Sequence, residues 1–321
     1  MSNTGFSPIP SASKEAQEFF ENFFSRTQRD SVPALALDDL EAWDALNSAH
    51  LESRRAYNGQ LIEKFSPVIT NVEFAGVPVL DIHPRNWADN GKVIVHIHGG
   101  GYAFGSALDG VAGSLPMAET TGMRVVSVDY SLAPRAKFDQ VTNEVYSVLE
   151  YLIHNGYNAA DIAITGDSAG AGLAAASALL ARDRGLGLLG AAVLWSPWAD
   201  VSCSGDSYQT LHDEEPCYKV ETMRMMGLGY AAVEDQSNPY ASPIHGNFKE
   251  GYPPTLIQVG TRELLLSDSV RLYQALDSAG QEVKLDVYEG MWHVFQLTPV
   301  VIPEAALAWE KVSKFICEKL A

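Results

Sequence analysis

Basic residues are scarce in this chain: 22 lysines and arginines stand against 40 aspartates and glutamates, a formal charge of −18. Such a charge repels phosphate backbones and anionic lipid, so we do not expect nucleic acid as a partner. Cysteine is scarce too. Cys203, Cys217 and Cys317 show no C-x-x-C spacing, which argues against a disulfide framework or a thiolate metal site and favours a reducing cytoplasm.

Long hydrophobic runs are absent. The longest apolar stretch, 169–181, is too short to span a bilayer, and the N-terminus has neither a basic start nor an apolar segment of the signal-peptide type. We therefore expect a cytoplasmic protein with no membrane insertion. Because 46% of its 321 residues are hydrophobic, the chain can bury a large core, and disorder is excluded as its main character.

The spacing of apolar residues predicts helices first, then alternating strands and helices. Helical spacing occupies the first sixty residues, with Asn58-Gly59 as the expected stop. Short β-branched runs begin near Val68, and apolar strands then alternate with amphipathic stretches. The alternation breaks over 198–250, which is long enough for an inserted helical segment, and 303–320 is expected to form a last helix. Inner strands that are apolar throughout are typical of an α/β sheet covered on both faces.

The strongest local motif is Gly166-Asp167-Ser168-Ala169-Gly170, between the predicted strand DIAIT and an apolar predicted helix. A G-x-S-x-G sequence in this context is typical of a nucleophile elbow. The sharp turn strains the serine backbone, and glycines two positions before and after it relieve the crowding. The pattern alone is weak, since it arises by chance in about one chain of this length in ten. Its place between strand and helix supports Ser168 as the nucleophile.

A second glycine motif, His98-Gly99-Gly100-Gly101, ends the apolar run KVIVHI. Consecutive glycines let backbone amides face a ligand without obstruction by a Cβ. A phosphate-binding loop is disfavoured, because the motif lacks both a GK[ST] ending and GxGxxG spacing. That the motif is only a flexible turn is an alternative interpretation. Ahead of a G-x-S-x-G elbow, however, HGGG is the pairing expected for an oxyanion hole.

A serine hydroxyl is a poor nucleophile at neutral pH, so Ser168 would need a histidine base and an acid that orients it. His293 is the best placed of eight histidines, because it follows the predicted strand VKLDVY near the end of the chain. Two acids, Glu263 and Asp268, follow the strand TLIQVG. Glu263 is nearer the strand end, whereas Asp268 is expected to cap a helix that begins near Ser269. The order Ser, acid, His is the one expected of a fold with this elbow.

With these motifs, the chain resembles the hormone-sensitive-lipase branch of the α/β-hydrolases, the bacterial family IV esterases. The resemblance runs from about Val68 to the C-terminus. It rests further on DYSLAP at 129–134 and SPWAD at 196–200, which are similar to the family's D-Y-x-L-A-P and S-P-W-x-D. It implies an α/β-hydrolase fold: a mostly parallel central sheet with helices on both faces and a helical cap. It also implies an oxyanion hole formed by the amides of Gly100, Gly101 and Ala169.

The resemblance divides the chain into core and cap. Residues 1–60 and 201–245 would form the cap, and residues 61–200 and 246–321 the hydrolase core. Aromatic and methionine side chains of the cap could line an acyl pocket, although core packing explains them equally well; they are Phe19, Phe20, Phe23, Met223, Met225, Met226 and Tyr230. The last helix and the strand VKLDVY could form a homodimer face, as in related esterases.

The acid motif departs from the family pattern. Where the family usually has D-P-L, this chain has Glu263-Leu264-Leu265, thirty residues before His293. A glutamate can hold the imidazole, but its extra methylene requires a slightly retracted backbone. Asp268 stays as the alternative acid.

We expect a serine carboxylic-ester hydrolase that acts on short- to medium-chain acyl esters, as small-molecule substrates, through an acyl-enzyme intermediate. This chemistry needs no metal and no organic cofactor. The alternative is a non-catalytic small-molecule-binding protein on a hydrolase scaffold, because fold alone does not establish activity.

Overall fold

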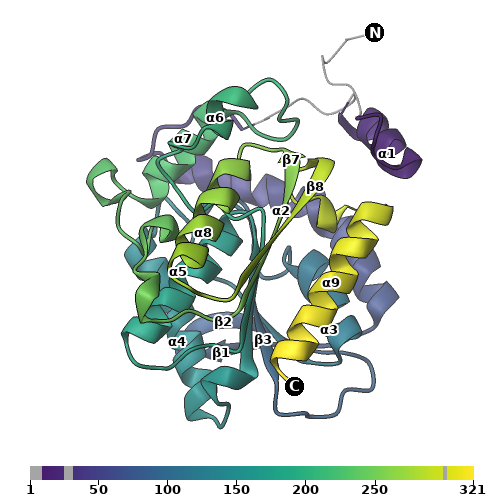
Figure 1. Ribbon diagram of the computed structural model, residues 1–321, viewed down its shortest axis with the longest axis vertical. Helices are drawn as coiled ribbons and strands as arrows, with labels where there is room; N and C mark the ends of the chain where they lie inside the picture. Colours follow the sequence, from purple (N-terminus) through teal and green to yellow (C-terminus); the bar gives the residue numbers. More distant parts are fainter. Residues whose placement is uncertain (1–8, 25–31, 299–301) are drawn as a thin grey trace.

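An eight-stranded sheet forms the centre of the molecule (Figure 1), with the strand order β1-β2-β4-β3-β5-β6-β7-β8. The computed structural model describes residues 9–24, 32–298 and 302–321. The strands are β1 (Val68–Phe74), β2 (Val77–His83), β3 (Val93–Ile97), β4 (Arg124–Val128), β5 (Ile162–Asp167), β6 (Ala191–Trp195), β7 (Thr255–Arg262) and β8 (Val283–Trp292). Strand β2 pairs antiparallel with β1 and β4, and the pairings from β4 through β8 are parallel. The expected mostly parallel sheet is confirmed.

Helices cover both faces of this sheet (Figure 1). On one face lie α3 (Val111–Thr121) and α9 (Pro303–Lys319). On the other lie α4 (Phe138–His154), α5 (Ala169–Asp183) and α8 (Leu266–Ser278). Because both faces are covered, the central strands β3 and β6 are buried along their whole length, which explains their unbroken apolar runs.

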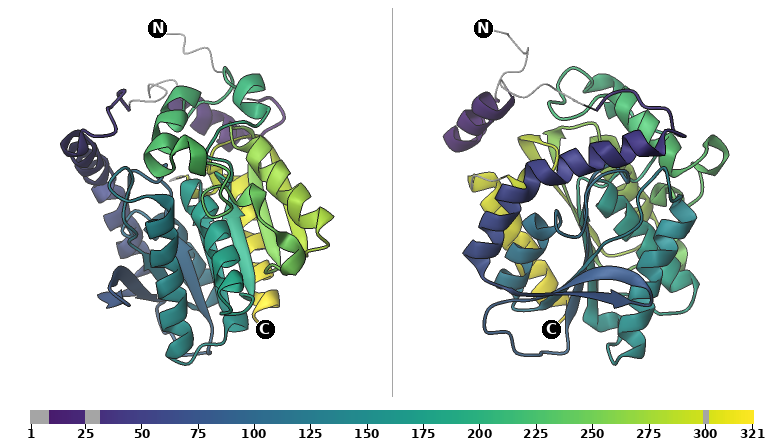
Figure 2. Two further views of the ribbon diagram at one scale, coloured as in Figure 1. Left: turned by 90° about the vertical axis from the view of Figure 1, so that its left-hand side faces the viewer. Right: turned by 180° about the vertical axis from the view of Figure 1, so that it is seen from behind.

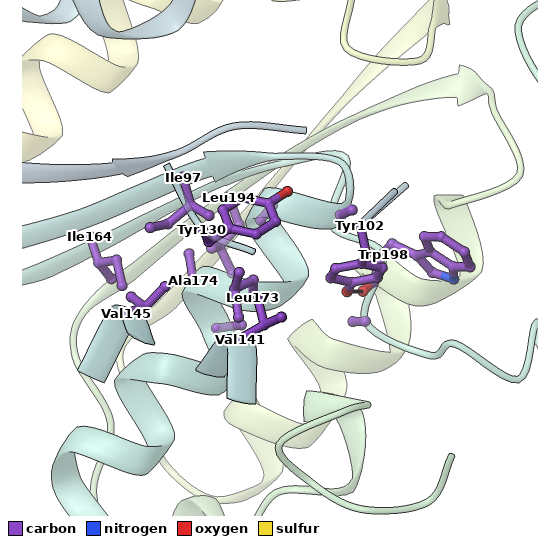
Figure 3. Close-up of a cluster of buried hydrophobic side chains, with 14 of the residues drawn as sticks. Ile97, Tyr102, Tyr130, Val141, Val145, Ile164, Leu173, Ala174, Leu194 and Trp198 are labelled. Atoms are coloured by element: carbon purple, nitrogen blue, oxygen red, sulfur yellow. Dashed lines mark hydrogen bonds between the residues drawn. The ribbon is translucent and has the colours of Figure 1, made fainter. Parts of the chain in front are cut away.

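The core beneath the elbow is made by strands and helices that are consecutive in βαβ units. Figure 3 shows inward-facing side chains of β3, β5 and β6 packed against the buried faces of α4 and α5. These side chains are Ile97, Ile164, Leu194, Val141, Val145, Leu173 and Ala174. Tyr102 and Trp198 continue the cluster toward the end of the sheet where the parallel strands finish. The core therefore reaches up to the region where a ligand is expected in this kind of sheet.

Helical segments gather over that end of the sheet (Figures 1 and 2). They are α1 (Lys14–Phe24), the first half of α2 (Leu40–Phe65), α6 (Ser207–Thr210) and α7 (Val220–Tyr230). Short 3₁₀ turns complete the described chain at Ala159–Asp161, Val233–Asp235, Pro243–His245, Phe248–Glu250 and Phe295–Leu297. The helical insertion predicted after β6 is confirmed by α6 and α7.

The stop predicted at Asn58-Gly59 is wrong, because α2 continues to Phe65. Asn58 is buried, and its Nδ2 donates to Asp109 Oδ1 at 2.9 Å, so a tertiary contact outweighs the weak helix preference of this pair. The helix ends at Ser66 instead. Ser66 takes a left-handed conformation with φ 46°, and its N–H donates to the carbonyl oxygen of Ile62.

The prediction that Asp268 caps a helix beginning near Ser269 is wrong, because α8 already begins at Leu266. The carboxylate is completely buried, and Oδ2 accepts the N–H groups of Ala199 and Asp200 at 3.0 and 2.8 Å. It therefore fastens α8 to the loop after β6. Burial, helped by the charge of Asp200, raises the pKa of Asp268 well above its ordinary value, although the two N–H donors oppose this shift.

The raised pKa predicts how stability responds to Asp268→Asn. A carboxyl whose pKa is higher in the folded state stabilises the fold below its unfolded pKa, and this contribution is lost as pH rises through the folded pKa. Asparagine keeps the acceptor oxygen without titrating. The variant should therefore lose less stability than the wild type between mildly acidic and neutral pH, measured by urea unfolding. Asp277→Asn, an exposed site on the same helix, is the control. A variant that is destabilised equally at both pH values would contradict the prediction.

Candidate active site

Ser168 lies at the tight turn between β5 and α5. Its φ of 56° and ψ of −124° are unfavourable for a residue with a side chain. A Cβ at Gly166 would lie 2.4 Å from the carbonyl oxygen of Gly170, and a Cβ at Gly170 would lie 2.3 Å from the carbonyl oxygens of Ile97 and His98. Both positions therefore require glycine: Gly166 because the turn folds back on it, and Gly170 because the turn lies directly against the end of β3.

His293 connects Ser168 to Glu263 through hydrogen bonds. Its Nε2 lies 2.9 Å from Ser168 Oγ, and its Nδ1 lies 2.8 Å from Glu263 Oε2. His293 directly follows β8, and Glu263 directly follows β7, so neighbouring parallel strands deliver the two side chains to one edge of the sheet. The structure brings these three predicted residues together. Asp268, the alternative acid, bonds to the loop after β6 instead.

The carboxylate of Glu263 is completely buried and has further partners. Its Oε1 accepts hydrogen bonds from Ser196 Oγ at 2.8 Å and from the N–H of Gly260 at 2.6 Å. Ser196 belongs to the SPWAD motif, and sequence reasoning did not assign it a role at the site. Its position at the end of β6, next to β7, was the available signal.

The electrostatic surroundings of His293 favour its protonated form. Burial by itself lowers the pKa of His293. The hydrogen bond and charge of Glu263 outweigh burial, Glu215 and Asp167 act in the same direction, and the net effect raises the pKa above its ordinary value of 6.5. A raised pKa strengthens His293 as a base toward the hydroxyl of Ser168.

The predicted oxyanion glycines line a cavity with Ser168. Gly100 has φ 117°, and a Cβ there would lie 2.0 Å from the carbonyl oxygen of Phe104. Gly101 has φ 62°, and a Cβ would lie 2.4 Å from Met226 Sδ. Ala169 is the first residue of α5, so its N–H has no acceptor within the helix.

Asp167 fastens the HGGG loop to the elbow. Its Oδ1 accepts the N–H of Gly99 at 3.1 Å, and a Cβ at Gly99 would lie 2.2 Å from its Oδ2. Burial raises the pKa of Asp167 to about 6, although the charge of His293 and the Gly99 N–H oppose the shift. The two glycine motifs are therefore in direct contact.

Two cavities meet at Ser168, Gly100 and His293. The smaller has a volume of about 230 Å³ and a largely apolar wall that includes Val32, Phe104, Trp198, Met223, Met226 and Leu265. The larger has a volume of about 360 Å³ and a wall that includes Phe19, Phe23, Phe24, Arg54, Asp109 and Trp292. His50, Cys217 and Tyr218 border both cavities.

Of the seven side chains considered for an acyl pocket, four border a cavity and three do not. Met223 and Met226 border the smaller cavity, and Phe19 and Phe23 border the larger one. The other three have packing contacts: Phe20 packs on Trp292, the Met225 sulfur accepts the N–H of Leu35, and Tyr230 stacks on Tyr102.

Three residues between α6 and α7 border the site although sequence reasoning missed them: Glu215, Cys217 and Tyr218. Glu215 is buried, and the Tyr218 ring meets the His293 ring edge to face at 5.3 Å. Nothing in the local sequence distinguishes them from surface residues of a loop. Their position depends on how the insertion folds back over β7.

The described residues contain no group of three or more His, Cys, Asp or Glu side chains that could hold a metal ion. None of the helices in the described ranges has the length and apolar character needed to span a bilayer.

Comparisons with known proteins agree with this geometry. A family profile described as "alpha/beta hydrolase fold" matches residues 94–297. An acetyl-hydrolase of Streptomyces hygroscopicus is 35% identical over 71% of this chain and 76% of its own length. An esterase of Acinetobacter venetianus is 31% identical over 77% of this chain and 81% of its own.

A solved structure of an esterase from the bacterial hormone-sensitive lipase family has a TM-score of 0.81 and 29% sequence identity, covering 97% of this chain and 100% of that one. With a family match over more than half of its length, the chain belongs to the α/β-hydrolase family, in the bacterial hormone-sensitive-lipase branch, and is a carboxylesterase.

Proposed function

We propose that this carboxylesterase works through a Ser168, His293 and Glu263 triad and an acyl-enzyme intermediate. The unbroken hydrogen-bond chain from Glu263 through His293 to Ser168 carries the proposal. Serine is activated by a base, and the base is oriented by a third group, which is the arrangement that nucleophilic catalysis at a hydroxyl requires.

In the first half of the reaction, Ser168 Oγ attacks the carbonyl carbon of the ester while its proton moves to His293 Nε2. The Nδ1–H of His293 donates to Glu263, whose negative charge stabilises the imidazolium and which keeps its own charge throughout. The alkoxide of the leaving alcohol takes the proton from Nε2 as the tetrahedral intermediate collapses. In the second half, water gives its proton to Nε2 and attacks the acyl-enzyme. The carboxylic acid leaves, and Ser168 regains its proton.

The amides of Gly100, Gly101 and Ala169 are the proposed donors to the negative oxygen of both tetrahedral intermediates. Support comes from the position of both glycines beside Ser168 in the cavity wall, from their positive φ angles, which favour glycine, and from the first amide of α5, which has no acceptor within the helix. Donors fixed in place before the reaction stabilise the developing charge without reorganising.

The substrate class we propose is esters of short- to medium-chain acids. The smaller cavity is bounded by Trp198, Met223 and Met226, so an apolar acyl chain of limited length would fill it. Related proteins include an acetyl esterase of Salmonella typhi and an ethyl acetate hydrolase of Pseudomonas putida, whose names point to small acyl groups. A non-catalytic binding protein is not favoured, because the named relatives are esterases.

We also propose the domain organisation inferred from the sequence: residues 1–60 and 201–245 form the cap, and residues 61–200 and 246–321 form the core. Helices α1, α2 and α7 contribute walls to the two cavities, which supports a cap that shapes the substrate site. Because α2 crosses residue 60 without a break, its second half ties this cap to the core.

A cytoplasmic location and a homodimer are further proposals. All three cysteines are free thiols, which supports a reducing compartment. Strand β8 lies at the edge of the sheet with Val287 exposed, and Leu307 is exposed on α9, so a second copy could cover this edge. Light scattering that gives a monomer mass at micromolar concentration would contradict the dimer.

Ser168→Ala tests the proposed nucleophile. Without Oγ no acyl-enzyme can form, so kcat for p-nitrophenyl butyrate should fall by about 10⁴-fold or more. The variant should also resist labelling by a fluorophosphonate probe. Ser278→Ala, which changes an exposed serine at the end of α8, should keep activity and labelling. Turnover within tenfold of the wild type in Ser168→Ala would refute the assignment.

Gly100→Ala tests the oxyanion hole. The new Cβ cannot fit beside Phe104, so the loop must shift and an amide donor moves out of place. We expect kcat to fall by about 10²- to 10³-fold with a smaller change in KM. Gly91→Ala is the matched control, because Gly91 also has a positive φ but has open space around its Cβ position. Equal losses in the two variants would indicate backbone strain rather than catalysis.

A further inference from the structure

The cap segment 214–218, between α6 and α7, holds the chain on both sides of Glu263. Glu214 Oε2 accepts a hydrogen bond from Arg262 Nη2 at 2.7 Å. Glu215 Oε2 accepts the N–H of Leu264 at 3.0 Å. Two consecutive glutamates of the cap therefore bind the residues directly before and directly after the proposed triad acid.

The two glutamates have different environments. The side chain of Glu214 is 56% exposed, and exposed ion pairs contribute little to stability. Glu215 is 1% exposed, and its Oε1 accepts the N–H of Cys217 at 2.6 Å, so both of its oxygens have backbone donors. Burial raises the pKa of Glu215, whereas the charge of His293 and these two N–H groups favour its ionised form. Burying a carboxylate costs free energy, so it requires such partners.

The segment also faces the base. Three residues after Glu215, the Tyr218 ring contacts the His293 ring edge to face. Between them, the N–H of Cys217 donates to Glu215, so the segment is held together beside the base. Besides Glu263, the charge of Glu215 acts on His293 in the direction that favours the imidazolium. The other titratable or charged groups around His293 lie on several elements. They are Asp167 on β5, Cys217 and Tyr218 on the segment, and, across the cavities, His50 and Arg54 on α2, His98 and Asp109.

We propose that Glu215 is a positioning residue for the reaction, an inference that rests on the proposed roles of Glu263 and His293. The hydrogen bond from the Leu264 N–H to Glu215 fixes the backbone after Glu263. The side chain of Glu263 is one methylene longer than an aspartate, so its backbone must lie further from His293 for the carboxylate to meet the imidazole. The negative charge of Glu215 stabilises the protonated base. The cap thus contributes to the catalytic geometry as well as to the walls of the cavities.

Glu215→Gln removes the charge and leaves a side chain of nearly the same size. Asp213→Asn is the matched control, because it removes a charge two residues away whose side chain is 97% exposed. For each protein, kcat and KM are measured across pH per active site, with sites counted by fluorophosphonate labelling. We expect kcat at the optimum to fall about tenfold in Glu215→Gln, the scale of one hydrogen bond to a charged group, with little change in KM.

The acidic limb of the plot of kcat against pH should also move to lower pH in Glu215→Gln, because losing a nearby negative charge lowers the pKa of His293. Asp213→Asn should match the wild type in both respects. A Glu215→Gln protein with wild-type kcat per labelled site and an unchanged acidic limb would overturn the proposal.

Glu215→Asp covers the case in which Glu215→Gln does not fold. Aspartate keeps the charge but is one methylene shorter, so the bond to the Leu264 N–H must lengthen. We expect a reduced kcat per labelled site with a wild-type acidic limb, and full kcat would overturn the positioning role. If the wild type itself is not labelled at Ser168, the proposed function fails, and this result is distinct from a null effect at Glu215.

Discussion

A carboxylate that is removed from water is stable only where hydrogen bonds within the protein replace those it made to water. Glu263 is such a group, and its donors are Ser196 Oγ, the Gly260 N–H and His293 Nδ1. These donors lie at or near the ends of β6, β7 and β8, which are neighbours in the sheet. The acid is therefore accommodated only because three neighbouring strands end close together, at the same end of the sheet. The hydrogen bond from His293 to Glu263 also holds the imidazole beside Ser168, so the stability of the acid and the geometry of the site have one origin.

Close approach of backbones sets the other half of the site. The motifs HGGG, GDSAG and SPWAD lie at or directly after the ends of β3, β5 and β6, and these strands are adjacent in the sheet. A Cβ at Gly172 would lie 2.1 Å from the carbonyl oxygen of Trp198, just as one at Gly170 would meet His98. The elbow is thus wedged between its two neighbouring strand ends. The three motifs are far apart in the sequence, but their backbones are in close contact at the same end of the sheet.

Sequence reasoning succeeded where chemistry and strand ends coincide, and it failed where tertiary contacts decide. The contact between Glu263 and His293 could be predicted, because a strand end and the distance to His293 along the chain restrict the candidates. The stop at Asn58-Gly59 was wrong because a bond to Asp109 outweighs local preference, and Asp268 was misjudged because its partners lie in the loop after β6. Helix α3 was not foreseen, since Gly113 and Pro116 make its sequence resemble a loop. Glu215 could not be foreseen, because no local pattern shows where an insertion folds back.

The steady-state turnover of Glu263→Gln tests whether this buried carboxylate orients the base. The amide would present a donor to Nδ1 and favour the wrong imidazole tautomer. We therefore expect kcat to fall by about 10⁴-fold in a protein that remains folded by circular dichroism. Glu289→Gln, at an exposed position on β8, should behave as the wild type. A kcat for Glu263→Gln within tenfold of the wild-type value would show that this carboxylate does not orient the base.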